Sequence, residues 1–174
     1  MASQTLLIRP ASLDDIPAIA ALAHRIWHAH YPSIISVAQI DYMLGQRYHD
    51  AALREQIAGE GQWLDLALLD GLAVGFAQYL QHAPDTIKLD KLYLDTTLHG
   101  QGLGSRLLAH VEARARELGA SNLTLAVNKH NEKAIATYRR NGFTVTDSVQ
   151  VDIGQGYIMD DYVMSKSLGD TPLT

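Results

Sequence analysis

The sequence predicts a mixed α/β fold, in which a central sheet of about seven strands carries helices on both faces. The pattern order indicates this: one strand, three helices, three strands, then helix, strand, helix and two strands. Asp70-Gly71 between two apolar runs is typical of a hairpin turn, so part of the sheet is antiparallel. The 174 residues suffice for one domain, expected over residues 1–168, with a flexible tail at 169–174.

The N-terminal third predicts one strand and three helices. Residues 5–8 form the strand, and a helix with apolar residues at helical spacing ends before Tyr31-Pro32. Its start stays open, because several residues can cap it: Ser12, Asp14 and Asp15. Ser36 and Gln39 resemble a capping box that opens a second helix. The second helix is expected to reach about Tyr48, and a third short one covers residues 51–58.

The rest of the chain alternates between period-2 and helical patterns. Strands are expected at 63–69, 73–80, 87–94, 123–127, 143–151 and 157–164. Helices are expected at 105–118 and 131–140, where Gly119 and Asn141-Gly142 supply the stops. The last two strands are expected to pair antiparallel.

Composition excludes several classes of protein. A net charge of -5 argues against a general nucleic-acid partner. Because the sequence has no cysteine, disulfides, thiolate metal sites and cysteine nucleophiles are ruled out. The sequence shows neither a signal peptide nor an apolar run of the roughly 20 residues that a membrane helix needs. We therefore expect a cytoplasmic protein with no membrane partner.

Gly100, Gly102 and Gly104 alternate in residues 99–106, between a predicted strand and a predicted helix. A glycine turn at a helix N-terminus forms an anion cradle, since the first helical amides lack internal partners and the helix dipole is positive there. The run lacks the lysine of a P-loop after Gly104. It also fails the dinucleotide fingerprint, because Leu107 stands where the third glycine or alanine belongs. The sequence thus predicts a phosphate-bearing ligand of another kind.

Two blocks of residues resemble the GCN5-related N-acetyltransferases. Leu92-Tyr93-Leu94 followed by Gln101-Gly102-Leu103-Gly104 resembles the acetyl-CoA signature of that family. Residues 128–143 resemble its Asn-x-x-Ala-x-x-x-Tyr-x-x-x-Gly-Phe segment. The blocks stand in the family's order and spacing, which implies a mostly antiparallel sheet. One position departs: His99 stands where the family usually has Arg or Gln.

The resemblance implies acetyl-CoA as co-substrate and no metal. Strand backbone at Leu92 and Leu94 would bind the pantetheine arm, amides of residues 101–105 the pyrophosphate, and Arg106 its rim. The residues implied to bind acetyl-CoA are Leu92, Tyr93, Leu94, His99, Gln101, Gly102, Leu103, Gly104, Ser105, Arg106, Asn131 and Tyr138.

The resemblance also implies that an amine attacks the thioester directly. Tyr138 would protonate the departing thiolate and the backbone N–H of Leu94 would polarise the carbonyl. The helical spacing of Tyr138 from Ala134 and Ile135 fits a core residue equally well. The general base is not identified; the candidates are Asp90, Tyr93, Asp160 and His30.

The C-terminal region carries the signal for the acceptor. Residues 141–164 contain four Asp and no Lys or Arg. An acidic hairpin favours a cationic acceptor, although a solvated acidic edge that discourages aggregation explains the pattern as well. Residues 152–164, 27–31 and 40–44 also resemble the PaiA-type spermidine/spermine acetyltransferases. The residues expected near the acceptor are His28, His30, Tyr31, Asp90 and Asp160.

The sequence leaves rival hypotheses open. His24, His28 and His30 lie close together, but the residue after His24 is Arg25, so the His-Glu-x-x-His pattern of a zinc site is absent. We expect N-acetylation of a small, polyamine-like amine. The alternatives are a protein or peptide N-acetyltransferase and a non-catalytic acetyl-CoA sensor. An exposed last strand would allow a homodimer.

Overall fold

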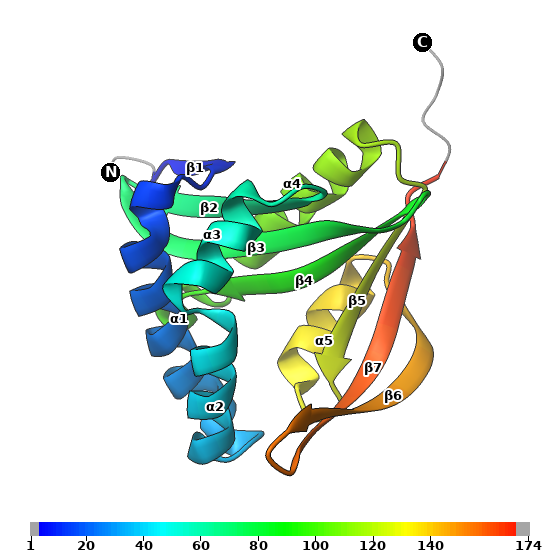
Figure 1. Ribbon diagram of the computed structural model, residues 1–174. Helices are drawn as coiled ribbons and strands as arrows, with labels where there is room; N and C mark the ends of the chain where they lie inside the picture. The colour runs from blue at the N-terminus through cyan, green and yellow to red at the C-terminus, as the bar shows by residue number, and fades with distance from the viewer. Residues whose placement is uncertain (1–3, 170–174) are drawn as a thin grey trace.

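The computed structural model describes residues 4–169 and contains one seven-stranded sheet (Figure 1). The strands are β1 (Leu6–Pro10), β2 (Gln62–Leu69), β3 (Leu72–Ala83), β4 (Thr86–Leu94), β5 (Asn122–Asn128), β6 (Thr144–Gly154) and β7 (Tyr157–Ser167). The helices are α1 (Ile16–His30), α2 (Val37–Arg47), α3 (Asp50–Ala58), α4 (Leu103–Glu117) and α5 (Glu132–Arg140). The strand order is β1-β2-β3-β4-β5-β7-β6, and β4 with β5 is the parallel pair.

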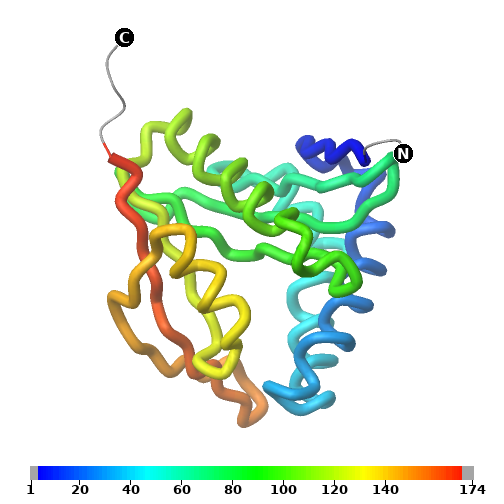
Figure 2. The backbone as a smooth tube through the Cα atoms, turned by 180° about the vertical axis from the view of Figure 1, so that it is seen from behind, coloured from blue at the N-terminus to red at the C-terminus, as the bar shows by residue number. Residues whose placement is uncertain are grey.

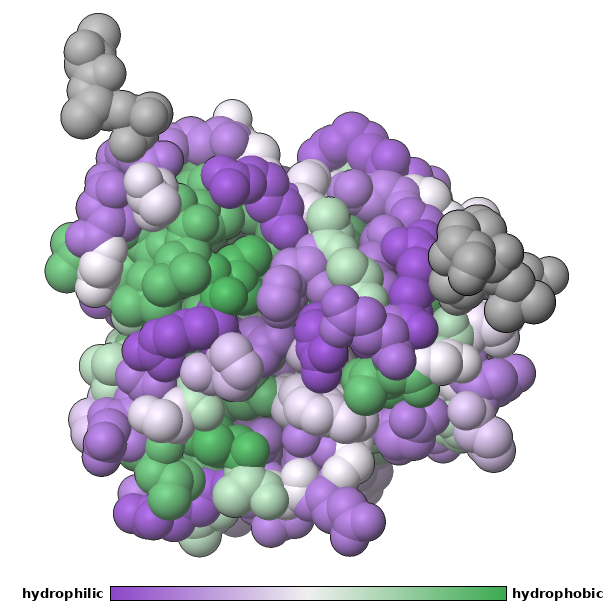
Figure 3. All heavy atoms as spheres, turned by 90° about the horizontal axis from the view of Figure 1, so that it is seen from above, coloured by the Kyte–Doolittle hydropathy of each residue, from purple (hydrophilic) through white to green (hydrophobic). Residues whose placement is uncertain are grey.

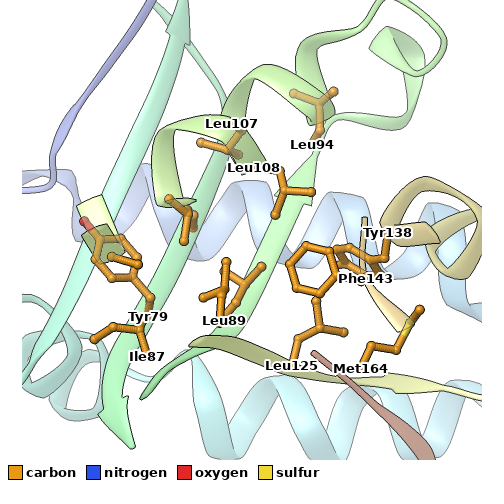
Figure 4. Packing of buried hydrophobic residues seen from close by; sticks show 14 of the residues in the cluster. Tyr79, Ile87, Leu89, Leu94, Leu107, Leu108, Leu125, Tyr138, Phe143 and Met164 are labelled. Carbon is orange, nitrogen blue, oxygen red and sulfur yellow. The ribbon is translucent and has the colours of Figure 1, made fainter. Parts of the chain in front are cut away.

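Helices cover both faces of the sheet, as the sequence predicts. One face packs against α1, α2 and α3, with Trp27 and Phe76 fully buried between helices and sheet (Figure 1). The opposite face carries α4 and α5 (Figure 2). There, Phe143 lies against Leu125 of β5, and Leu107 of α4 belongs to the same buried cluster (Figure 4). The mixed, mostly antiparallel architecture is confirmed.

Strands β4 and β5 pair only along their first halves. The parallel ladder joins Thr86–Leu89 to Asn122–Leu125, and beyond it the two strands diverge (Figure 1). In β4, Gln78 of β3 pairs with Lys91 and Tyr79 pairs with Leu89, so Asp90 is an extra, bulged residue. The second half of β4 therefore pairs with β3 on one edge and faces an opening on the other.

Most predicted elements are confirmed, with shifts at their ends. Helix α4 begins at Leu103, two residues earlier than expected, because Gly102 takes a left-handed φ of 77° as the N-cap. The predicted capping box forms by half: Ser36 Oγ accepts from Gln39 N at 3.1 Å. The Gln39 side chain instead donates to the Ile158 carbonyl of β7 at 3.4 Å. Apart from Gly169, the predicted tail lies outside the described residues.

The surface mixes polar areas with separate apolar patches (Figure 3). Large exposed apolar side chains occur on the edge strands: Leu7 of β1, and Val145 and Val151 of β6. The expected exposed last strand is wrong, because β7 lies between β5 and β6 and the edge there is β6. Edge strands allow pairing with a second copy, and the homodimer stays a prediction. Within residues 4–169, no helix combines the length and apolarity needed to cross a membrane.

Replacing Leu107 with Ala is expected to lower the free energy of unfolding by about 2–5 kcal/mol, because it leaves a cavity between α4 and the sheet. Leu107 is fully buried. Leu72→Ala is the matched control: this leucine is 72% exposed, so its loss should cost below about 0.5 kcal/mol. Urea denaturation of both variants measures the difference, and equal losses would contradict the assignment of the core.

Candidate active site

A cavity of about 960 Å³ occupies the opening between β4 and β5. On one side it reaches the glycine turn and the facing side of α5, including Ser105 and Tyr138. On the other side it reaches α1, α2 and the β6–β7 hairpin, including Tyr31 and Asp161. The gap in the sheet thus joins two arms that lie on opposite faces.

The first arm ends at the start of α4. Gly102 has no side chain to cap this helix, and the first turn closes only where Arg106 N donates to Gly102 O at 3.1 Å. The preceding amides, those of residues 103–105, sit at the positive end of the helix dipole. A Cβ on Gly104 would meet no atom within 4 Å, and its φ is not positive. The protein's own packing therefore does not require a glycine at position 104, whereas close approach of a ligand would.

His99 is turned toward the end of β4. Its Nε2 lies 3.2 Å from the carbonyl oxygen of Leu94, to which it donates. The side chain thus holds the backbone of the strand whose free edge faces the cavity. The one irregular position of the glycine run therefore has a structural partner.

Asn131 links the two halves of the molecule. As the N-cap of α5, its Oδ1 accepts from Ala134 N at 3.4 Å and also from His30 Nε2 at 3.1 Å. His30 belongs to α1, 101 residues away along the chain. Because Nε2 carries the proton in this bond, Nδ1 of the neutral ring is a free acceptor. Burial lowers the pKa of His30, which favours that neutral form.

Tyr138 lines the cavity from α5. It is 9% exposed and its ring meets Phe143 edge-on, with centroids 5.7 Å apart. Burial raises the pKa of its hydroxyl, which keeps its proton across the neutral range. Tyr138 thus packs in the core and also presents a protonated hydroxyl at the cavity wall, so both readings that the sequence leaves open remain predictions.

An aromatic cluster forms the wall of the second arm. Tyr31 packs on Trp27 with ring centroids 4.6 Å apart, and its hydroxyl donates to that of Tyr93 at 3.5 Å. Burial raises the pKa of Tyr93 well above its ordinary value. A phenol that keeps its proton cannot serve as a general base, which disfavours Tyr93 for that role.

Two acceptor residues lie away from the cavity. Asp160 is bound to Lys129 at 2.8 Å, whereas its neighbour Asp161 lines the cavity, because successive side chains of β7 point to opposite faces. His28 has both ring nitrogens 2.8 Å from oxygens of His24 and Asp41. The bond to the His24 carbonyl and the carboxylate of Asp41 raise the pKa of His28. The structure therefore places Asp160 and His28 outside the lining of the cavity.

The remaining predicted residues divide in the same way. Those that line the cavity are His30, Tyr31, Asp90, Leu92, Tyr93, Leu94, His99, Gly102, Gly104, Ser105, Asn131 and Tyr138. Those outside its lining are Gln101, Leu103 and Arg106; Leu103 is buried in the core, and Arg106 is exposed.

Sequence reasoning missed four charged residues of the second arm: Arg47, Lys88, Lys91 and Asp161. Lys91 is buried beside the bulge, where its Nζ donates to Gln56 Oε1 at 2.7 Å and lies 4.9 Å from the centre of the Tyr48 ring. Burial lowers the pKa of Lys91 to about 8. Strand alternation with Tyr93 was the signal that could have placed Lys91 on this face.

Comparison with known proteins identifies the family. The model of the acetyltransferase (GNAT) family matches residues 23–143. The chain belongs to this family. It is an acetyl-CoA-dependent N-acetyltransferase, and the family that the sequence resembles is confirmed.

Two relatives match nearly the full chain. An uncharacterised N-acetyltransferase of Mycobacterium tuberculosis is 28% identical over 156 residues, which is 90% of this chain and 99% of the relative. The spermidine N(1)-acetyltransferase of Thermoplasma acidophilum is 26% identical over 157 residues, which is 88% of this chain and 94% of the relative. The crystal structure of PaiA N-acetyltransferase from T. acidophilum in complex with coenzyme A matches this fold with a TM-score of 0.81 at 24% identity. The match covers 94% of this chain and 99% of that chain. These similarities support the PaiA-type resemblance.

Proposed function

We propose that this enzyme transfers the acetyl group of acetyl-CoA directly to a primary amine of a small, polyamine-like acceptor. The observation that carries the proposal is the single cavity through the sheet, which joins an anion-cradling helix start to an arm with unpaired acidic groups. The two substrates would enter from opposite faces and meet where β4 and β5 part.

On the donor side, the amides of residues 101–105 would hold the pyrophosphate of acetyl-CoA, aided by the α4 dipole. Arg106, exposed on the first turn, would contribute at the rim. The pantetheine arm would lie along the free edge of β4 at Leu92 and Leu94, as an added strand does. Asn131 would bind the pantetheine arm from the opposite side of the opening. His99 would act by fixing the Leu94 carbonyl.

The chemistry moves one acetyl group and one proton. The amine nitrogen bonds to the thioester carbon, the C–S bond breaks, and a proton leaves nitrogen while sulfur gains one. The Leu94 N–H would polarise the carbonyl. Since a thiol has a pKa of about 8.5 and burial raises the pKa of Tyr138, its hydroxyl would chiefly stabilise the forming thiolate by donating a hydrogen bond. Asp90 and His30 are the base candidates that reach the cavity and can accept a proton.

Two observations support a cationic acceptor. Asp90 and Asp161 line the acceptor arm, and neither forms a salt bridge within residues 4–169. The spermidine acetyltransferase relative acts on a polyamine by its name. A peptide acceptor is the second candidate, favoured by a 36% match over 70 residues to the peptidyl-lysine N-acetyltransferase YjaB of Salmonella typhimurium. The cytoplasmic location stays a prediction.

Release of CoA against a panel of amines tests this function. We expect turnover with spermidine and simple primary amines, and little with lysine peptides or aminoglycosides. Turnover restricted to peptides would favour the second candidate. Tight binding of acetyl-CoA with no thiol released by any amine would instead indicate the sensor.

Gly104→Ala is expected to weaken acetyl-CoA binding by at least about tenfold, since the added methyl occupies the space that the pyrophosphate needs. Stability should hold or rise by about 0.4–1 kcal/mol, because Ala loses less backbone freedom than Gly on folding and the φ of Gly104 is not positive. Gly45→Ala is the matched control, as Gly45 also lies inside a helix with open space around its Cα. Calorimetric titration and thermal melts measure both quantities; unchanged affinity in Gly104→Ala would remove α4 from the donor site.

Tyr138→Phe is expected to lower kcat roughly 10²-fold, because the thiolate loses its hydrogen-bond donor. Affinity for acetyl-CoA should change less than about twofold, since the ring and its packing on Phe143 remain. Tyr157→Phe removes a hydroxyl outside the cavity lining and should leave kcat unchanged. Equal turnover of wild type and Tyr138→Phe would assign Tyr138 to the core alone.

A further inference from the structure

Asp161 is a buried carboxylate with an unused oxygen. Its side chain is 6% exposed, it lines the cavity from β7, and its Oδ1 has no hydrogen-bond partner within residues 4–169. A carboxylate taken out of water without a partner costs free energy unless a ligand supplies one. Burial accordingly raises the pKa of Asp161. The position therefore indicates a binding site for a hydrogen-bond donor, most favourably a cation.

Two hydrogen bonds hold the β6–β7 hairpin, which carries Asp161, against α2. Tyr42 of α2 donates to the Ile153 carbonyl of β6 at 2.8 Å, and Gln39 of α2 donates to the Ile158 carbonyl of β7 at 3.4 Å. Figure 1 shows the tip of this hairpin beside the end of α2. These bonds hold the hairpin against the helix, so Asp161 faces an arm with a fixed wall.

A second carboxylate lies at the other end of the arm. Asp90, the bulged residue of β4, is next to the point where β4 and β5 part. Asp161 of β7 pairs with Asn128 of β5. Asn128 lies three residues beyond Leu125, the last residue of β5 that pairs with β4. In a continuous sheet two strand spacings, on the order of 10 Å, would separate β4 from β7, and the parting of β4 from β5 makes this a lower bound on the distance between the two carboxylates.

We propose that Asp161 binds the distal ammonium of a linear diamine or polyamine, while the reactive amine lies beside Asp90 at the parting of the strands. This inference rests on the proposed function and adds the element that selects the acceptor. An acceptor whose two ammonium groups lie at least on the order of 10 Å apart can bind both carboxylates. A monoamine or a short diamine can bind only one carboxylate.

Arg47 gives the proposal an internal check. It lines the same arm from α2, its charge counteracts the effect of burial on Asp161, and it forms no salt bridge with Asp161 in the described chain. A guanidinium here competes with an incoming ammonium for the Asp161 carboxylate. Were the acceptor instead an amine with a carboxylate, Arg47 would be its natural partner.

Steady-state kinetics with octylamine, diaminobutane and diaminooctane test the proposal. For the wild-type enzyme, KM should be lowest for diaminooctane. Asp161→Asn should raise KM for diaminooctane at least about tenfold and leave that of octylamine within about twofold. Asp147→Asn removes an equal charge from the exposed face of the hairpin and should change neither KM beyond about twofold. Thermal melts verify that each variant is folded.

Asp161→Asn should raise KM for diaminooctane, whereas Arg47→Gln should lower that KM by about threefold or more. The proposal is overturned if Asp161→Asn affects octylamine and diaminooctane equally, or if Arg47→Gln raises KM for the diamine. Wild-type turnover that is indifferent to chain length would also overturn it, while leaving acetyl transfer to small amines intact. Absence of turnover with every amine would instead refute the proposed function.

Discussion

The parting of β4 from β5 is the constraint on which the rest of the molecule depends. A continuous sheet would have no opening between its halves, and the hydrogen bonds along the second half of β4 would be used on both edges. Here the parallel ladder stops at Leu89 and Leu125, and the bulge at Asp90 turns β4 away. The free edge carries backbone groups that need partners. A ligand with amide groups can supply these hydrogen-bond partners. The break that removes pairing within the sheet therefore leaves an edge that can bind such a ligand.

The split sheet remains one body because its two halves share contacts on both faces. On the α4 face, Leu89 and Leu125 belong to one apolar cluster that also takes in Phe143 (Figure 4). Across the opening, the bond between His30 and Asn131 ties α1 to α5. Packing thus holds the cavity walls at a set separation without closing the gap.

The sequence predicts the fold, which the structure confirms, and a donor site, which stays a proposal; both predictions follow local rules. Strand and helix periods, Asp70-Gly71 and the alternating glycines each act within a few residues. The acceptor side depends on long-range register. Whether Asp160 or Asp161 faces the cavity is decided by the pairing of β7 with β5, which no local pattern reveals. The bulge at Asp90 likewise shows only in the pairing of β3 with β4, where Gln78 lies opposite Lys91 and Tyr79 opposite Leu89.

The cavity separates its charges by the kind of group that carries them. At the donor end, the positive potential comes from backbone amides and a helix dipole. These groups do not titrate, so this potential does not change with pH. At the acceptor end, side chains set the potential, and their partners matter. Lys91 is occupied by Gln56 and the Tyr48 ring, so its charge is already stabilised away from the arm. Within residues 4–169, Arg47 and Asp161 have no such partners, so under the proposal the charge of the acceptor decides how they pair.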